Sequence, residues 1–184
     1  MNRVRTSGPF GGAPPALVFD PPPGWKVGLA LAVALLLQTT VAPYLTIRGA
    51  MPSLVLVVVL WYGLRTNIAS GLLFGTVAGA LEDALAGWTG AAWTLSTAIV
   101  GALAGRTAGT VVTESRLWLV PYVAIATIVR YGIATIVLRS EGRVVALPAL
   151  HAHALLWQAL LNALIAFLVL TFVPKTAVSR VGLR

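Results

Sequence analysis

The sequence predicts an all-α membrane protein, a bundle of six transmembrane helices, on three observations. The chain of 184 residues is 58% hydrophobic and only 10% charged, whereas soluble domains average about 25% charged residues. Several apolar runs approach the ~20 residues that a helix needs to cross a ~30 Å hydrocarbon core. Glycines also recur at every fourth position within two of these runs, a spacing that lets transmembrane helices approach closely.

Composition also limits the possible functions. The chain has no cysteine, which excludes disulfides, thiolate metal sites and cysteine catalysis. The net charge is +8, but the basic residues sit mostly at the ends of apolar runs, which indicates topology and contact with membrane lipids rather than nucleic-acid binding. His151 and His153 point to different sides of a helix, so we expect no metal site. With no nucleotide motif and no catalytic constellation, we expect a protein that is not an enzyme and has no cofactor.

The predicted organisation is one membrane domain between two polar ends. Residues 1–24 are rich in proline and glycine and predict a flexible cytoplasmic extension. Residues 25–173 form the six-helix domain, and residues 174–184 form a basic cytoplasmic tail. Arg3 and Arg5 resemble the start of a signal peptide, but the apolar run begins only after Lys26, so we expect a retained first helix.

The six predicted helices cover about residues 25–42, 52–64, 68–86, 90–112, 117–138 and 150–173. Pro43 is expected to end the first helix, and Pro52 to open the second. The valine-rich run from Leu54 also suits a buried strand, but a lone strand leaves its backbone unsatisfied in lipid, so a helix is predicted. Near the end of the first helix, Gln38 and its two following threonines are expected to bond the local backbone rather than form a ligand site.

The distribution of Lys and Arg predicts that both termini are cytoplasmic. With that orientation, nine of the 13 basic residues lie inside, three lie outside, and Arg130 lies within a helix. The inside set is Arg3, Arg5, Lys26, Arg65, Arg106, Arg116, Lys175, Arg180 and Arg184; the outside set is Arg48, Arg139 and Arg143. Such a bias sets the orientation of most multi-pass proteins.

The glycine repeats predict that the third and fourth helices form a hairpin at the packing centre of the bundle. Small residues four apart form a ridge on one side of a helix, suited to packing within the bundle or against a partner helix. The two ridges are Gly71, Gly75 and Gly79, and Gly101, Gly105 and Gly109. We expect one ridge face to serve the hairpin and another small-residue face to remain for a partner.

Three charged residues interrupt the apolar helices: Glu82, Asp83 and Arg130. Because adjacent helical residues point about 100° apart, the two acids cannot share a face. Either Glu82 reaches the outer interface while Asp83 points inwards, or both sit at a hydrated helix end near Gly87. An arginine in mid-helix is expected to pair in the bundle interior, with Asp83 or with an acid of a partner protein.

Four motifs in order resemble the rod shape-determining protein MreD family, over about residues 27–173. They are Leu37-Gln38-Thr39-Thr40-Val41-Ala42-Pro43, Gly49-Ala50-Met51-Pro52-Ser53-Leu54, the Gly71 ridge continuing through Glu82-Asp83, and Val100 to Arg106. Asp83 matches an aspartate of the family's third helix. Ser53 stands where the family usually has aspartate, which puts a role for that acid in doubt here.

The resemblance implies a non-catalytic subunit of the cell-elongation machinery (the elongasome) in the bacterial inner membrane. Its expected partners are a single-span MreC-like protein and, through it, a RodA-type glycosyltransferase and its transpeptidase, which build the lateral peptidoglycan. The resemblance also implies a fold similar to the S components of energy-coupling-factor transporters. The alternative function is therefore a vitamin-binding S component, although the short outer loops offer few ligand-binding side chains.

Overall fold

The computed structural model describes residues 22–108, 118–143 and 148–172. Within these ranges the chain is all-helical, as predicted, with an isolated bridge between Ile47 and Ala50 as its sole extended pairing. The helices are α1 (Gly24–Thr40), the 3-10 helix η1 (Ala42–Leu45), α2 (Leu54–Gly63), α3 (Ile68–Ala86), α4 (Ala92–Arg106), α6 (Leu119–Ser140) and α7 (Pro148–Phe172). Most of the predicted N-terminal extension, the predicted basic tail and Gly109 lie outside the described residues.

Two helix boundaries differ from the predicted ones. The first helix ends at Thr40, and Pro43 lies within η1 rather than directly after α1. The second helix begins at Leu54, two residues after Pro52, because Ser53 is its N-cap and accepts a hydrogen bond from the Leu56 amide at 3.4 Å.

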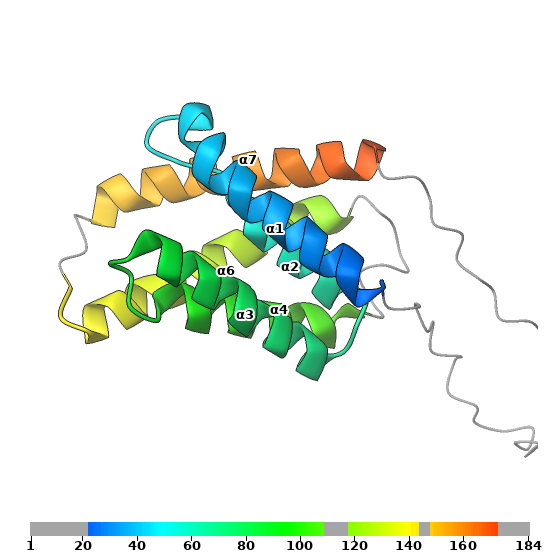
Figure 1. The fold of residues 1–184 in the computed structure, drawn as a ribbon. Coiled ribbons are helices and arrows are strands. Elements are labelled where there is room, and N and C mark those ends of the chain that lie inside the picture. Colours follow the sequence, from blue (N-terminus) through cyan, green and yellow to red (C-terminus); the bar gives the residue numbers. More distant parts are fainter. Residues whose placement is uncertain (1–21, 109–117, 144–147, 173–184) are drawn as a thin grey trace, which may run out of the picture.

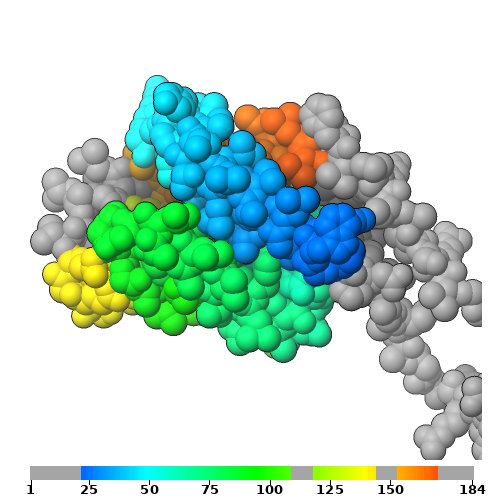
Figure 2. All heavy atoms as spheres, viewed as in Figure 1, coloured from blue at the N-terminus to red at the C-terminus, as the bar shows by residue number. Residues whose placement is uncertain are grey.

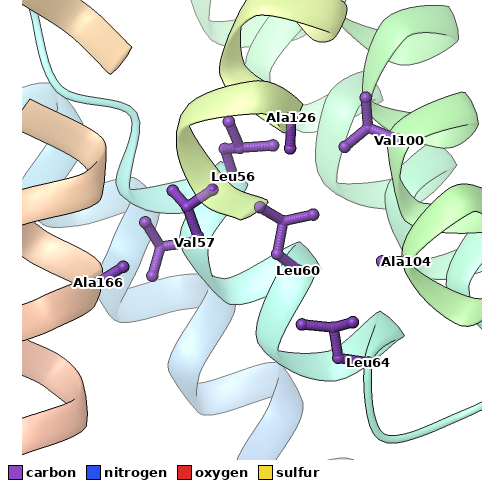
Figure 3. Packing of buried hydrophobic residues seen from close by; sticks show 9 residues of the cluster. Leu56, Val57, Leu60, Leu64, Val100, Ala104, Ala126 and Ala166 are labelled. Atoms are coloured by element: carbon purple, nitrogen blue, oxygen red, sulfur yellow. The ribbon is translucent and has the colours of Figure 1, made fainter. Parts of the chain in front are cut away.

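Helix α2 occupies the centre of the bundle, which corrects the expectation that the glycine-rich hairpin would be the packing centre. Helices α1, α3, α4, α6 and α7 all contact α2 (Figure 1). Its Val55, Leu56, Val59 and Leu60 are fully buried. Figure 3 shows Leu56 and Leu60 among the side chains of the surrounding helices. A helix that is apolar on every side is suited to this central position.

The α3–α4 hairpin is the most intimate helix pair of the bundle. Helix α3 starts after Asn67, whose side chain accepts from the Ser70 amide at 2.9 Å. It ends at Gly87, which has a left-handed backbone with φ of 70°; glycine adopts this conformation without a steric penalty. The chain then turns back through Gly90 into α4.

The outward surface is apolar along the helices. Exposed leucine and isoleucine side chains line α1, α3, α4, α6 and α7, and Figure 2 shows the face to which α1 and the hairpin contribute. Helices α3 and α6 are long and apolar enough to cross a membrane, and shorter apolar helices cover Gly24–Thr40, Leu54–Gly63 and His153–Val169. An apolar exterior around buried polar groups is the arrangement that a bilayer favours.

Candidate functional site: a buried polar network and its pocket

Arg130 of α6 is the centre of a buried polar network. Its side chain is almost fully enclosed, with 4% of the residue exposed. Its Nε donates to Thr97 Oγ1 at 2.8 Å, and its Nη1 donates to Ser53 Oγ at 2.7 Å. Its Nη2 forms an ion pair with Glu82, and the guanidinium lies 4.6 Å from the centre of the Trp93 ring. The positive charge is thus neutralised inside the protein, as its cost in lipid requires.

The acid that pairs with Arg130 is Glu82, and not either of the two predicted partners, Asp83 or an acid of a partner protein. The alternative that placed Glu82 at the outer interface is also wrong. Glu82 is 7% exposed and points into the bundle. Its second oxygen accepts from Gln38 Nε2 at 2.7 Å, and Gln38 Oε1 in turn accepts from the Val55 amide at 3.1 Å. Gln38 therefore connects α1, α2 and α3 instead of bonding its local backbone.

Asn162 of α7 completes the network on the opposite side. Its Oδ1 accepts from the Ser53 amide at 2.7 Å, and its Nδ2 donates to Thr127 Oγ1 at 3.0 Å. The network therefore reaches all six α-helices of the described chain. Within that part of the chain, every buried side-chain nitrogen and oxygen has at least one hydrogen-bond partner, as buried polar groups in apolar surroundings require.

Asp83 has a separate structural role, because it caps the N-terminus of α4. Its two carboxylate oxygens accept from the amides of Trp93, at 3.1 Å, and Thr94, at 2.8 Å. They also accept from the hydroxyls of Thr89, at 2.6 Å, and Thr94, at 2.7 Å. The first amides of a helix lack intrahelical acceptors and carry partial positive charge. Asp83 is 8% exposed, so neither acid lies at a hydrated helix end.

The glycine ridges face each other within the hairpin. A Cβ on Gly71, Gly75 or Gly79 would overlap the backbone of α4, and a Cβ on Gly101 or Gly105 would overlap the backbone at the start of α3. The ridges therefore serve helix packing. All five glycines are used inside the hairpin. The prediction that these glycines also offer a face to a partner protein is therefore wrong.

A pocket of about 320 Å³ lies beside the Arg130–Glu82 pair. Its polar lining comes from network side chains, from Thr39 of α1 and from Gln158 of α7. Its apolar lining includes Leu35, Leu85 and Met51. This volume is at the lower end of the range seen for small-ligand sites.

Sequence reasoning missed Ser53, Thr97 and Asn162 as members of the network. Serine and threonine in helices bond their own backbone so often that their presence carries little information. Asparagine and glutamine cannot satisfy their amides as easily in that way. Asn162 and Gln38, as amides in apolar helices, were therefore the available signal.

The cap on α4 gives the first prediction. Asp83→Ala should lower the free energy of unfolding by roughly 1–2 kcal/mol or more, because two helix amides and two hydroxyls lose their acceptor. The control is Glu141→Ala, which removes an exposed pair with Arg143 and should have little effect. Thermal unfolding of the purified variants in detergent measures both. Equal behaviour of the two variants would refute the capping role.

Comparison with known proteins relates this chain to a family of shape-determining proteins. A model of the family described as rod shape-determining protein MreD matches residues 24–176. No curated protein and no solved structure matches the chain at a significant level. The match covers far more than half of the chain and confirms the resemblance that the motifs indicate. The chain belongs to the MreD family of membrane-associated rod shape-determining proteins.

Proposed function

We propose that this protein is a non-catalytic integral subunit of the cell-elongation machinery, which binds a single-span MreC-like protein and, through it, supports a RodA-type glycosyltransferase and its transpeptidase. Family membership supports the role in rod shape. The observation that carries this binding role, which we call the scaffold role, is the buried polar network. Its charged groups are bonded to one another in the bundle interior, while the surface offered to other membrane proteins is apolar.

The proposed architecture is a six-helix transmembrane domain over residues 25–173, in the bacterial inner membrane, with a cytoplasmic extension at 1–24 and a cytoplasmic tail at 174–184. Its supports are the helical bundle and the bias of basic residues. Helix α2 has ten residues, so at about 15 Å it is the shortest of the proposed spans. We also propose that the fold of this domain is similar to that of the S components of energy-coupling-factor transporters.

Reporter fusions test this topology. Fusions after Thr46 and after Glu141 should report an external location, because three basic residues flank these loops against nine on the other side. A fusion after Thr66, between α2 and α3, is the matched internal control. An internal reading at Thr46 or Glu141 would contradict the proposed orientation.

An exposed small-residue face lies on α1, and we propose it as the docking surface for the partner helix. Gly24, Gly28 and Ala32 are exposed and four residues apart. A Cβ on Gly24 or Gly28 would meet no atom within 4 Å. A partner helix could therefore approach this face closely, which favours helix association in membranes.

Co-purification tests partner binding and its location together. Wild-type protein from detergent-solubilised membranes should bring down the MreC-like protein in fixed proportion. Gly28→Leu should fold normally but lose most of the partner, because the leucine would separate the two backbones. The matched control is Gly132→Leu on α6, also without neighbours within 4 Å, which should retain the partner. Loss in both variants would refute docking on α1, and no partner with wild type would refute the scaffold.

The pocket is the observation that favours the alternative, a vitamin-binding S component. Family membership favours the scaffold. The same purification separates the two functions, because an S component would co-purify with transporter ATPases and retain a vitamin-sized molecule.

A further inference from the structure

We propose that the pocket beside Arg130 and Glu82 binds the zwitterionic headgroup of a membrane phospholipid, of the phosphoethanolamine type. The phosphate would lie at Arg130, the ammonium at Glu82, and the acyl chains along the apolar surface outside. The proposed docking residues Gly24, Gly28 and Ala32 do not line this pocket.

Arg130 and Glu82 line the pocket and have hydrogen-bonding capacity that the described protein does not use. A guanidinium has five N–H donors, and the structure gives acceptors to three: one on Nε, one on Nη1 and one on Nη2. One donor on each Nη thus lacks an acceptor among the described residues, and Arg130 lines the pocket. Each Glu82 oxygen accepts one hydrogen bond and has capacity for another. Gln158 adds an amide to the lining for which the described chain provides no partner.

The charges that line the pocket favour a zwitterionic ligand. Arg130 and Glu82 are directly paired, so together they have no net charge. A ligand that is only anionic gains from Arg130 but is repelled by Glu82, and a cation meets the reverse. A zwitterion with its charges a few ångströms apart satisfies both at once. It also adds charge-assisted hydrogen bonds to the free donors and acceptors.

The walls indicate that the zwitterion belongs to a lipid. Leu35, Leu85 and Met51 line the pocket, and the helices on either side continue as exposed apolar surface. Leu36 of α1 is 63% exposed, and Leu160 of α7 is 60% exposed. Acyl chains leaving the pocket would cover this surface, whereas a water-soluble zwitterion would gain nothing from it.

Lipid competition with the purified chain tests the proposal. Delipidated wild type in detergent is mixed with equal amounts of phosphatidylethanolamine and phosphatidylglycerol, and native mass spectrometry counts the lipid retained. We expect one phosphatidylethanolamine per chain and about tenfold weaker retention of phosphatidylglycerol. Soluble O-phosphoethanolamine, added alone, should not raise the thermal unfolding temperature, whereas phosphatidylethanolamine should.

Three outcomes would overturn the proposal. Equal or better retention of phosphatidylglycerol would indicate an anion site. Stabilisation by soluble phosphoethanolamine equal to that by the lipid would indicate a site for a free zwitterion. Retention of neither lipid would leave the pocket without this function. Because the partner protein is absent from the experiment, none of these results depends on the proposed scaffold role.

Matched variants locate the binding. Ala86→Trp adds an indole to the pocket lining and should reduce retained phosphatidylethanolamine about tenfold. Leu73→Trp, at an exposed position of the same helix outside the pocket lining, should not reduce it. Gln158→Leu removes the uncommitted amide and should weaken retention severalfold. Unfolding temperatures without added lipid separate these effects from misfolding, and equal retention by Ala86→Trp and Leu73→Trp would exclude this pocket.

Discussion

Arg130→Met should remove most of the folded protein from detergent extracts. The variant leaves the Glu82 carboxylate buried without its counter-ion. Removing one partner of a buried ion pair costs about 3–5 kcal/mol, a large share of the roughly 5–15 kcal/mol that stabilises a typical fold. Ser53 and Thr97 also lose a donor. Size-exclusion chromatography of solubilised, fluorescently tagged protein measures the surviving monodisperse fraction.

A second substitution shows whether the charge is the cause. Glu82→Gln combined with Arg130→Met should restore much of the folded fraction, because a neutral amide still accepts from Gln38 and needs no counter-ion. Arg143→Met, in the half-exposed pair with Glu141, should behave as wild type. If the double variant is no better than Arg130→Met alone, the ion pair is not what makes Arg130 necessary.

Gly75→Leu should separate α3 from α4 and prevent stable folding of the hairpin. A Cβ at this position already overlaps the backbone carbonyl of Thr97, and backbone atoms cannot move aside without shifting a whole helix. Gly105→Leu should act in the same way against Asn67. Gly28→Leu, on the exposed face of α1, should accumulate like wild type. The same chromatographic assay measures all three, and a normal profile for Gly75→Leu would contradict the close packing.

The helical class and the residues of the hairpin contact could be predicted from the sequence because both depend on local patterns. Apolar run length predicts helices, and glycines four apart mark a ridge that Gly71, Gly75 and Gly79 place against α4. The use of both ridges inside one hairpin could not be predicted. A spacing pattern marks a packing face without identifying what packs on it.

The polar network was less predictable because its contacts join residues far apart in the chain. Ser53 and Arg130 are 77 positions apart, and Ser53 and Asn162 are 109 apart. The choice between Glu82 and Asp83 as partner of Arg130 depends on where α4 begins: Asp83 faces the amides of that helix, and Glu82 is turned towards α6. A single sequence contains no information on such long-range geometry beyond the presence of polar residues in apolar helices.

The four-residue repeat leaves the α3–α4 pair with an ambiguity in alignment that Asp83 removes. Gly71 faces Gly101, Gly75 faces Thr97, and Gly79 faces Trp93. A slide by one residue would drive side chains into carbonyls. A slide by four, about 6 Å along the axis, would again bring most glycines opposite backbone and preserve much of the contact. Only the in-register alignment places the Asp83 carboxylate at the first amides of α4. The glycines thus define a set of equally spaced alignments, and one carboxylate selects among them.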